Sequence, residues 1–162
     1  MIIAVNLPAR RPRGREIGEN PRVPDTDAIA AARRTIEAWN KGDEESIRAA
    51  FTEDVHYVPS GEIPGYTKPI DGIEEYVGFF RDWMSSFTDY VLMPVRVTDI
   101  GGGGVLVDTD QEGTSVSGAK VSRHIFMHAV MRDGRCASYA AFTEEAQALE
   151  HAGLDSWPAE RD

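Results

Sequence analysis

A histidine and a tyrosine in the last third of the chain could together carry out proton transfer. His128 and Tyr139 lie within residues 121–142, VSRHIFMHAVMRDGRCASYAAF, a pattern of two strands joined by a tight turn. If Asp133 and Gly134 are the two loop residues, the register places His128 opposite Tyr139. In an apolar cavity the imidazole would act as general acid or base, and the phenol would orient it or donate to a developing enolate oxygen. A cross-strand aromatic pair that satisfies its own polar atoms is the equally open alternative.

Three carboxylates alternate along the preceding segment, at Asp108, Asp110 and Glu112. A strand would place them on one face, about 7 Å apart, and burial there would raise at least one pKa and provide a general acid or base. Val105 and Val107, in the other phase, are apolar. The pattern therefore favours a solvated strand face for the carboxylates.

The remaining histidines and the cysteine do not predict a metal centre. His124 and His128 are four residues apart on one strand, so about 13 Å separates their backbones and they cannot share an ion. His56 adds no recognised ligand spacing. Cys136 is the only cysteine, which excludes an intrachain disulfide and a thiolate cluster, and no motif presents it as a nucleophile. We expect no metal and no other cofactor.

Charge and length limit the class of protein. The chain has 162 residues and a formal charge of −10, and an acidic body repels phosphate backbones and anionic lipid. We therefore expect neither a nucleic-acid nor a membrane partner. The opening MIIAVNL lacks the pattern of a secretory signal, and with a single cysteine the expected location is cytoplasmic. The composition predicts a disordered basic, Pro-containing tail over residues 1–24, a single domain over 25–154 and a C-terminal tail over 155–162.

The order of elements predicts an α+β fold. Apolar residues at helical spacing indicate helices between residues 25 and 42, 43 and 51, 71 and 87, and 143 and 152. Strands are expected at 55–58, 90–100, 105–117 and in the hairpin of 121–142. This order makes a sandwich of helices on one face of a bent antiparallel sheet. Because both phases of the hairpin are largely apolar, we expect the other face to be covered by a second subunit, giving a homodimer.

Three stretches resemble the SnoaL-like branch of the nuclear transport factor 2-like superfamily. They are WNKGDEESIRAAFTEDVHY at 39–57, the following DGIEEYVGFF, and the late RDGR with EEAQALEHAGL. The resemblance spans roughly residues 26–154. It implies a cone-shaped barrel, in which a strongly bent antiparallel sheet wraps three or four helices around a deep apolar pocket. The superfamily includes polyketide cyclases, ketosteroid isomerase, limonene epoxide hydrolase and proteins with no known reaction.

The resemblance can be carried over one position at a time. The oxyanion tyrosine of ketosteroid isomerase falls on Thr35, its general base on Pro59, and its second oxyanion donor near His128, so that machinery is absent. The ionisable residues of limonene epoxide hydrolase fall on non-ionisable ones, Thr109, Gln111 and Ala141. The same comparison implies that these three residues, with His128 and Tyr139, look into the pocket.

Two functions follow as expectations. The first is an enzyme, of isomerase, cyclase or lyase type, that performs cofactor-independent acid/base chemistry on an apolar oxygenated small molecule such as a polyketide or terpenoid. The second is a non-catalytic ligand-binding or subunit-interaction protein of the same fold. For the enzyme, the expected catalytic residues are His128 and Tyr139. The expected substrate-binding residues are Trp39, Tyr57, Thr109, Gln111 and Phe126.

Overall fold

The computed structural model describes residues 23–61 and 65–159, in which helices and strands surround one curved sheet. Its elements are α1 (Val23–Lys41), α2 (Glu44–Ala50), β1 (Phe51–Val58), β2 (Ile70–Asp71), α3 (Ile73–Ser85), β3 (Phe87–Gly101), β4 (Gly104–Ser115), β5 (Lys120–Arg132), β6 (Arg135–Phe142) and α4 (Glu145–Ala152). Every expected helix and strand is present, and the short β2 is additional. The expected N-terminal tail lies outside the described residues up to Arg22, and the division into tail, domain and tail stays a prediction.

Helix α1 presents an apolar stripe to the sheet. Ala28, Ala32, Ile36 and Trp39 recur at four- and three-residue spacing and are all buried. The chain leaves the helix at Gly42, whose φ of 76° is the left-handed conformation that glycine adopts without steric cost. Within the part of the chain that the structure describes, no helix combines the length and apolar character needed to cross a bilayer.

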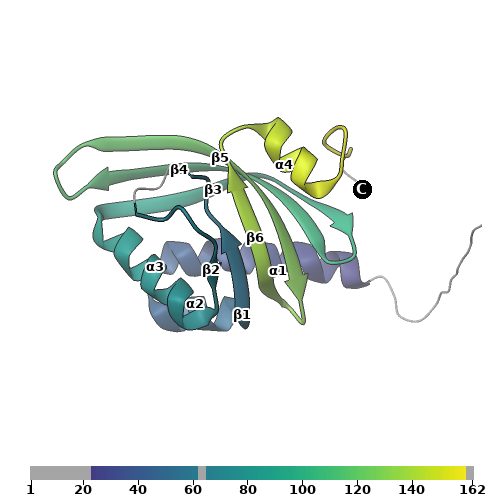
Figure 1. Cartoon of the computed structure of the whole chain (residues 1–162), viewed down its shortest axis with the longest axis horizontal. Helices are drawn as coiled ribbons and strands as arrows, with labels where there is room; N and C mark the ends of the chain where they lie inside the picture. The colour runs from purple at the N-terminus through teal and green to yellow at the C-terminus, as the bar shows by residue number, and fades with distance from the viewer. Residues whose placement is uncertain (1–22, 62–64, 160–162) are drawn as a thin grey trace, which may run out of the picture.

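The sheet is mixed rather than purely antiparallel. Its six described strands follow the order β2-β1-β6-β5-β4-β3, and β1 runs parallel to β6. Short turns join β3 to β4, β4 to β5 and β5 to β6, and such turns require antiparallel neighbours. No short turn links β1 to β6, because α3 and four strands intervene, so the antiparallel expectation fails for this pair. The result is the curled, unclosed sheet seen in Figure 1.

The hairpin register differs from the prediction by one residue. Asp133 (φ 54°) and Gly134 (φ 79°) form the turn, and Arg132 pairs with Arg135 as expected. A register shift follows between Met131 and Val130, because β6 inserts an extra residue there. Beyond it, Ala129 lies opposite Tyr139 and His128 lies opposite Ala140. The predicted pairing of His128 with Tyr139 is therefore wrong, and the two side chains point to opposite faces of the sheet.

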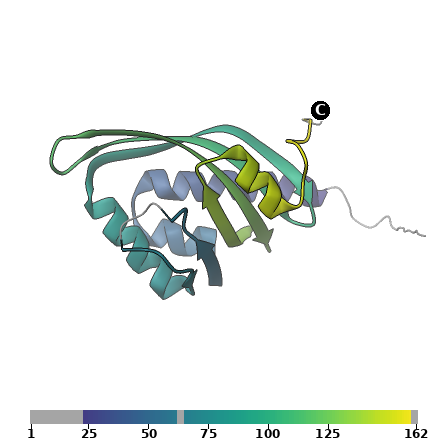
Figure 2. The same cartoon turned by 45° about the horizontal axis from the view of Figure 1, so that its top comes forward.

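The two faces of the sheet are covered differently. Helices α1, α2 and α3 lie on the concave face, and α4 lies across the opposite, outer face (Figures 1 and 2). Outside the main core, four buried residues are shared between this outer face and α4: Leu106, Ala140, Ala148 and Leu149. The chain's own α4 therefore covers apolar outer-face surface that the sequence analysis assigned to a second subunit. The homodimer stays a prediction.

Candidate functional site

A cavity lies between the concave face of the sheet and helices α1 and α3, with a volume of about 80 Å³. Its wall is mostly apolar and aromatic, which is typical of small-molecule sites. Its aromatic and polar lining residues include Trp39, Tyr57, Trp83, Tyr90, Gln111, Arg123 and Tyr139.

Aromatic rings build the most buried part of the wall. Tyr57 on β1 and Tyr139 on β6 are register partners across the parallel pair, and their rings stack with centroids 4.3 Å apart. Phe79 of α3 packs against Tyr57 at 5.2 Å, and Trp39 of α1 packs against Phe79 at 6.1 Å. Four elements, α1, β1, α3 and β6, thus meet in one aromatic cluster, which fixes the ring of Tyr139 in place.

A chain of hydrogen bonds ends at the Tyr139 hydroxyl. Trp39 Nε1 donates to Tyr76 Oη at 3.0 Å, and the Tyr76 and Tyr139 hydroxyls lie 2.6 Å apart. An indole N–H can only donate, so Tyr76 Oη accepts this bond. Either hydroxyl can donate in the bond between Tyr76 and Tyr139, and since Tyr139 lines the cavity while Tyr76 does not, we assign the Tyr76 proton to this bond. The Tyr139 proton is left free to bond a group in the cavity.

Burial keeps these phenols protonated. It raises the pKa of Tyr76 and of Tyr139 well above the ordinary tyrosine value, and it likewise raises the pKa of Tyr57. A phenol that stays neutral at physiological pH can donate a hydrogen bond to a carbonyl or enolate oxygen. Tyr139 therefore has the chemistry of an oxyanion donor.

The more exposed end of the cavity is polar. Ser60, Trp83, Tyr90, Gln111 and Arg123 all line it and are only partly buried. They come from the segment just after β1, the last turn of α3, the first part of β3, the second half of β4 and the first part of β5. These segments meet at one end of the cone, which we call the mouth.

No aspartate, glutamate or histidine lines the cavity in the described part of the chain. Carboxylates and imidazoles are the usual general bases of enzymes, so the described wall lacks a conventional base. Residues 23–61 and 65–159 also contain no group of three or more His, Cys, Asp or Glu side chains placed to hold a metal ion.

His128 lies on the outer face and cannot reach the cavity. Its Nδ1 is 2.9 Å from Nδ1 of His151 on α4. Burial, and then the neighbouring His151, lower the pKa of His128. A depressed His128 pKa thus has a cause outside the cavity, and the predicted role of His128 as acid/base in the pocket is wrong.

The other predicted site residues divide between the cavity and elsewhere. Trp39, Tyr57 and Gln111 line the cavity as expected, and their contact with a substrate stays a prediction. Phe126 pairs with Asp108 on the outer phase and packs its ring against His124 at 4.7 Å, so its assignment to the pocket wall is wrong. Thr109 is on the inner phase, but it is fully buried, does not line the cavity, and donates its hydroxyl to the Ile125 carbonyl at 3.1 Å.

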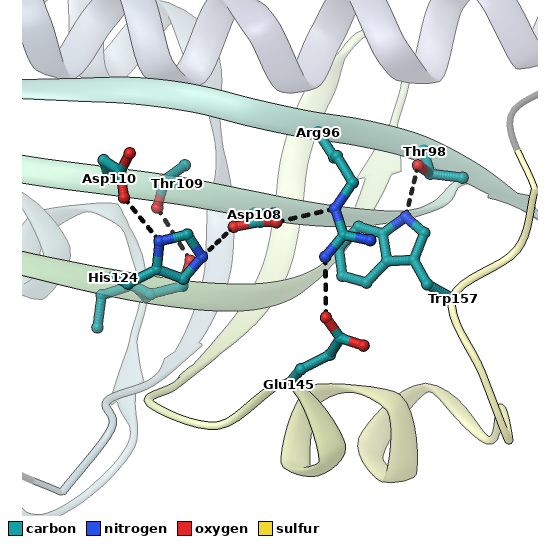
Figure 3. A network of polar contacts seen from close by, with 9 residues as sticks. Arg96, Thr98, Asp108, Thr109, Asp110, His124, Glu145 and Trp157 are labelled. Atoms are coloured by element: carbon teal, nitrogen blue, oxygen red, sulfur yellow. Dashed lines mark hydrogen bonds and ion pairs between the residues drawn. The ribbon is translucent and has the colours of Figure 1, made fainter.

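The outer-face carboxylates form an ion-pair network instead of a uniformly solvated row (Figure 3). Asp108 is only 4% exposed; it accepts from Arg96 Nε at 2.8 Å and pairs with His124 Nε2. Asp110 binds the other imidazole nitrogen at 2.6 Å. The solvated-face expectation is therefore wrong for Asp108, because Arg96 and His124 compensate its burial.

The same network secures the C-terminal segment. The Arg96 guanidinium lies 3.8 Å from the centre of the Trp157 ring and also pairs with Glu145 of α4 at 2.9 Å. Trp157 Nε1 donates to Thr98 Oγ1 at 2.9 Å (Figure 3). The segment after α4 is thus packed against the sheet at Trp157.

Two residues of the site were not predicted from the sequence: Arg123, which lines the cavity, and Tyr76, which bonds Tyr139 without lining the cavity. Arg123 shares its strand phase with Ile125, Met127 and Ala129, so a cation stands in an otherwise apolar row. Tyr76 belongs to the apolar stripe of α3, and only the structure shows that its hydroxyl bridges Trp39 and Tyr139.

Comparisons with known proteins agree with this architecture. A SnoaL-like domain profile matches residues 32–139. A search of curated proteins gives no match. Among solved structures, a protein of Jannaschia sp. CCS1 provisionally described as a SnoaL-like polyketide cyclase aligns with 17% identity and a TM-score of 0.64, covering 87% of this chain and 100% of that one.

Two further structures show the range of chemistry reported for similar folds. Wild-type IdmH from Streptomyces antibioticus, provisionally described as a polyketide cyclase, has 21% identity and a TM-score of 0.61, covering 78% of this chain and 99% of its own. An LEH-like epoxide hydrolase of M. tuberculosis has 18% identity and a TM-score of 0.60, covering 78% and 89%. At these identities the likeness shows a shared fold. With two thirds of its length matched by the domain profile, the chain belongs to the SnoaL-like family, of the NTF2-like fold.

Proposed function

We propose that the chain binds an apolar, oxygenated small molecule of polyketide or terpenoid type in the cone cavity and promotes its cyclisation or isomerisation without a cofactor. The observation that carries this proposal is the hydrogen-bond chain from Trp39 through Tyr76 to Tyr139, which leaves one buried phenol proton facing the cavity. Tyr139 would donate that proton, as a hydrogen bond, to a carbonyl oxygen of the ligand.

The chemistry that this donor supports is carbonyl polarisation. A hydrogen bond to the carbonyl oxygen makes the carbonyl carbon more electrophilic and stabilises the enolate or alkoxide that develops on the oxygen. In an intramolecular aldol closure, the enol carbon attacks the carbonyl carbon and the enol proton ends on the new alkoxide oxygen. Such a step needs no cofactor, and a rigid aromatic wall favours it by holding a flexible chain in its folded conformation.

Two of the similar structures support a cyclase in particular, because they are provisionally described as polyketide cyclases. The positions where the epoxide hydrolases of the superfamily carry ionisable residues are non-ionisable in this chain, at Thr109, Gln111 and Ala141. The proposal therefore excludes epoxide opening by that machinery.

A second candidate is a binding protein that performs no reaction. It is favoured by one observation, that no Asp, Glu or His side chain lines the described cavity wall. Such a protein would carry or sequester the same class of apolar oxygenated molecule.

The test begins with native mass spectrometry of the protein purified from its own host, and identification of any bound compound. The compound should be an apolar molecule with at least one carbonyl or hydroxyl oxygen. A time course by NMR with the bound compound's open-chain or isomeric precursor then separates the two candidates. Conversion supports the cyclase or isomerase, and binding of precursor and product without conversion supports the binding protein.

Two variants locate the chemistry. Tyr139→Phe should weaken ligand binding or slow conversion about fivefold or more, because it removes one hydrogen bond from a buried site. His128→Ala is the matched control and should change neither, since His128 lies on the outer face. Loss of activity in His128→Ala with full activity in Tyr139→Phe would overturn the assignment.

A further inference from the structure

The mouth of the cavity carries a positive charge that the proposed carbonyl chemistry does not use. Arg123 lines the cavity at the start of β5, and no carboxylate or histidine lines it anywhere in residues 23–61 and 65–159. Its side chain is only partly buried, so a ligand can reach it from the cavity. The chain as a whole has a formal charge of −10, so the sign of the charge at Arg123 is opposite to that of the protein.

Polar groups surround this cation. Gln111 is the register partner of Arg123 across β4 and β5, so both side chains rise from neighbouring backbone positions on the same face. Arg123 also lies close enough to Tyr57 and Tyr90 to lower their pKa against the larger, opposing effect of burial, which brings the pKa of Tyr90 to about 12. The positive charge of Arg123 thus acts on two neutral hydroxyl groups of the cavity wall, those of Tyr57 and Tyr90.

Two further polar atoms at the mouth are buried without a hydrogen-bond partner that the described residues provide. They are Ser60 Oγ and Trp83 Nε1, and both residues line the cavity. The Trp83 indole lies near the Tyr90 hydroxyl, whose pKa it lowers, but their arrangement does not form a hydrogen bond of good geometry. Buried donors of this kind normally have a partner, and a ligand oxygen at the mouth would provide one.

The size of the cavity places part of any ligand at the mouth. A cavity of roughly 150 Å³ holds a single benzene ring, and this one measures about 80 Å³. A ligand of two or more rings must therefore extend beyond this cavity, through its more exposed end beside Arg123 and Gln111. Tyr139 lies opposite Ala129, which is six residues from Arg123 on the same strand. The distance along β5 between Arg123 and the position opposite Tyr139 is therefore roughly 20 Å.

We propose that Arg123 and Gln111 form a binding site for an anionic oxygen group, so that the ligand is an elongated apolar organic acid. Its acidic group, a carboxylate or an acidic enol, binds at the mouth, and its apolar body extends toward Tyr139. This inference rests on the proposed function, because it assumes that the cavity is the ligand site. It adds the substrate class: an acid rather than a neutral polycycle.

The guanidinium is suited to this role. It offers planar, paired N–H donors that match the two oxygens of a carboxylate, and it stays charged at every physiological pH. The Gln111 amide can donate one more hydrogen bond to the same group. A neutral amide in place of the carboxylate would lose the charge-assisted bonds, which are about twice as strong as neutral ones.

Two probes of the same shape test the inference: 2-naphthoate and its neutral counterpart, 2-naphthamide. Isothermal titration calorimetry measures both affinities, and quenching of Trp39 and Trp83 fluorescence reports entry into the cavity. The wild-type protein should bind naphthoate about tenfold more tightly than naphthamide. Raising the salt concentration should weaken naphthoate binding more than naphthamide binding.

Substitutions then assign the preference to Arg123. Arg123→Gln should reduce naphthoate affinity to that of naphthamide and leave naphthamide binding nearly unchanged, whereas Arg123→Lys should keep part of the preference. Arg33→Gln makes the same charge change at an exposed position of α1 and should have no effect. Circular dichroism and the melting temperature establish that each variant is folded.

The outcomes separate this inference from the proposed function. Equal binding of both probes to the wild type, or a naphthoate preference that survives in Arg123→Gln, would overturn the anion site and leave the cavity as a ligand site. Binding of neither probe would overturn the inference together with the proposed ligand site.

Discussion

Replacing Tyr76 by phenylalanine tests the hydrogen-bond chain on which the proposed function depends. The Tyr76 side chain is fully buried, and its hydroxyl lies between Trp39 Nε1 at 3.0 Å and the Tyr139 hydroxyl at 2.6 Å. Tyr76→Phe keeps the ring and its packing but leaves the Trp39 N–H without an acceptor and Tyr139 without its donor.

The size of the effect follows from these two losses. Each buried polar group that loses its partner costs about 1–3 kcal/mol, and the Tyr139 hydroxyl can recover part of this cost by bonding water in the cavity. We therefore expect Tyr76→Phe to lower the free energy of unfolding by about 2–4 kcal/mol. Tyr139→Phe leaves the Trp39 bond intact but leaves the buried Tyr76 proton without an acceptor, so about 1–3 kcal/mol is expected.

Urea denaturation followed by far-UV circular dichroism measures both values, and the double variant Tyr76→Phe/Tyr139→Phe completes a mutant cycle. The two substitutions should be non-additive, because they share one hydrogen bond. A Tyr76→Phe variant as stable as the wild type, or additive effects in the double variant, would refute the hydrogen-bond chain.

Two other predictions concern the outer face. Trp157→Ala should lower the free energy of unfolding by about 1–2 kcal/mol in urea denaturation, through loss of the contact with Arg96 and of one hydrogen bond; an unchanged midpoint would mean that the C-terminal segment adds no stability. The pKa of His124 is raised above 6.5, first by its hydrogen bond to Asp110 and then by Asp108, against the opposing effect of burial. Its contribution to stability is therefore fully present below pH 6.5 and is lost as pH rises through the raised pKa. Melting temperatures between pH 6 and 9 should fall with pH in the wild type and fall less in His124→Gln, and parallel curves would contradict this assignment.

The sequence was sufficient to predict the fold because the elements are locally consistent. The stripe of α1 ending at Trp39 and the Asp133-Gly134 turn each indicate their structure without reference to the rest of the chain. The phase of β5 was not predicted: the sequence analysis placed Phe126 and His128 in the pocket, whereas Met127 and Ala129 line the cavity.

The predicted pairing of His128 with Tyr139 was wrong because β6 contains one extra residue. That residue changes which face of the sheet His128 points to relative to Tyr139. The shift between Met131 and Val130 lies next to a turn that was itself predicted correctly, and it moves His128 from beside Tyr139 to the outer face. Nothing in the local sequence distinguishes a regular hairpin from a bulged one here. Tyr139 itself lines the cavity, as the resemblance implied.

The burial of the Asp108 carboxylate could not be predicted from the sequence either. Asp108 is separated by twelve residues from Arg96 and by sixteen from His124, and its burial depends on both together with α4. Contacts of this kind depend on tertiary packing. The alternation of residue types along one strand does not show which residues of other strands will lie beside it.

The measurement that tests the central claim most directly is the carbonyl stretching frequency of a bound ketone. Infrared spectra of 2-acetylnaphthalene with a carbon-13 carbonyl would be compared between the wild type and Tyr139→Phe, with His128→Ala as control. If Tyr139 donates its hydrogen bond to a ligand in the cavity, the frequency is lower in the wild type and in His128→Ala than in Tyr139→Phe. The same frequency in all three proteins, or no binding of the ketone, would contradict the claim that Tyr139 is the oxyanion donor of a ligand site.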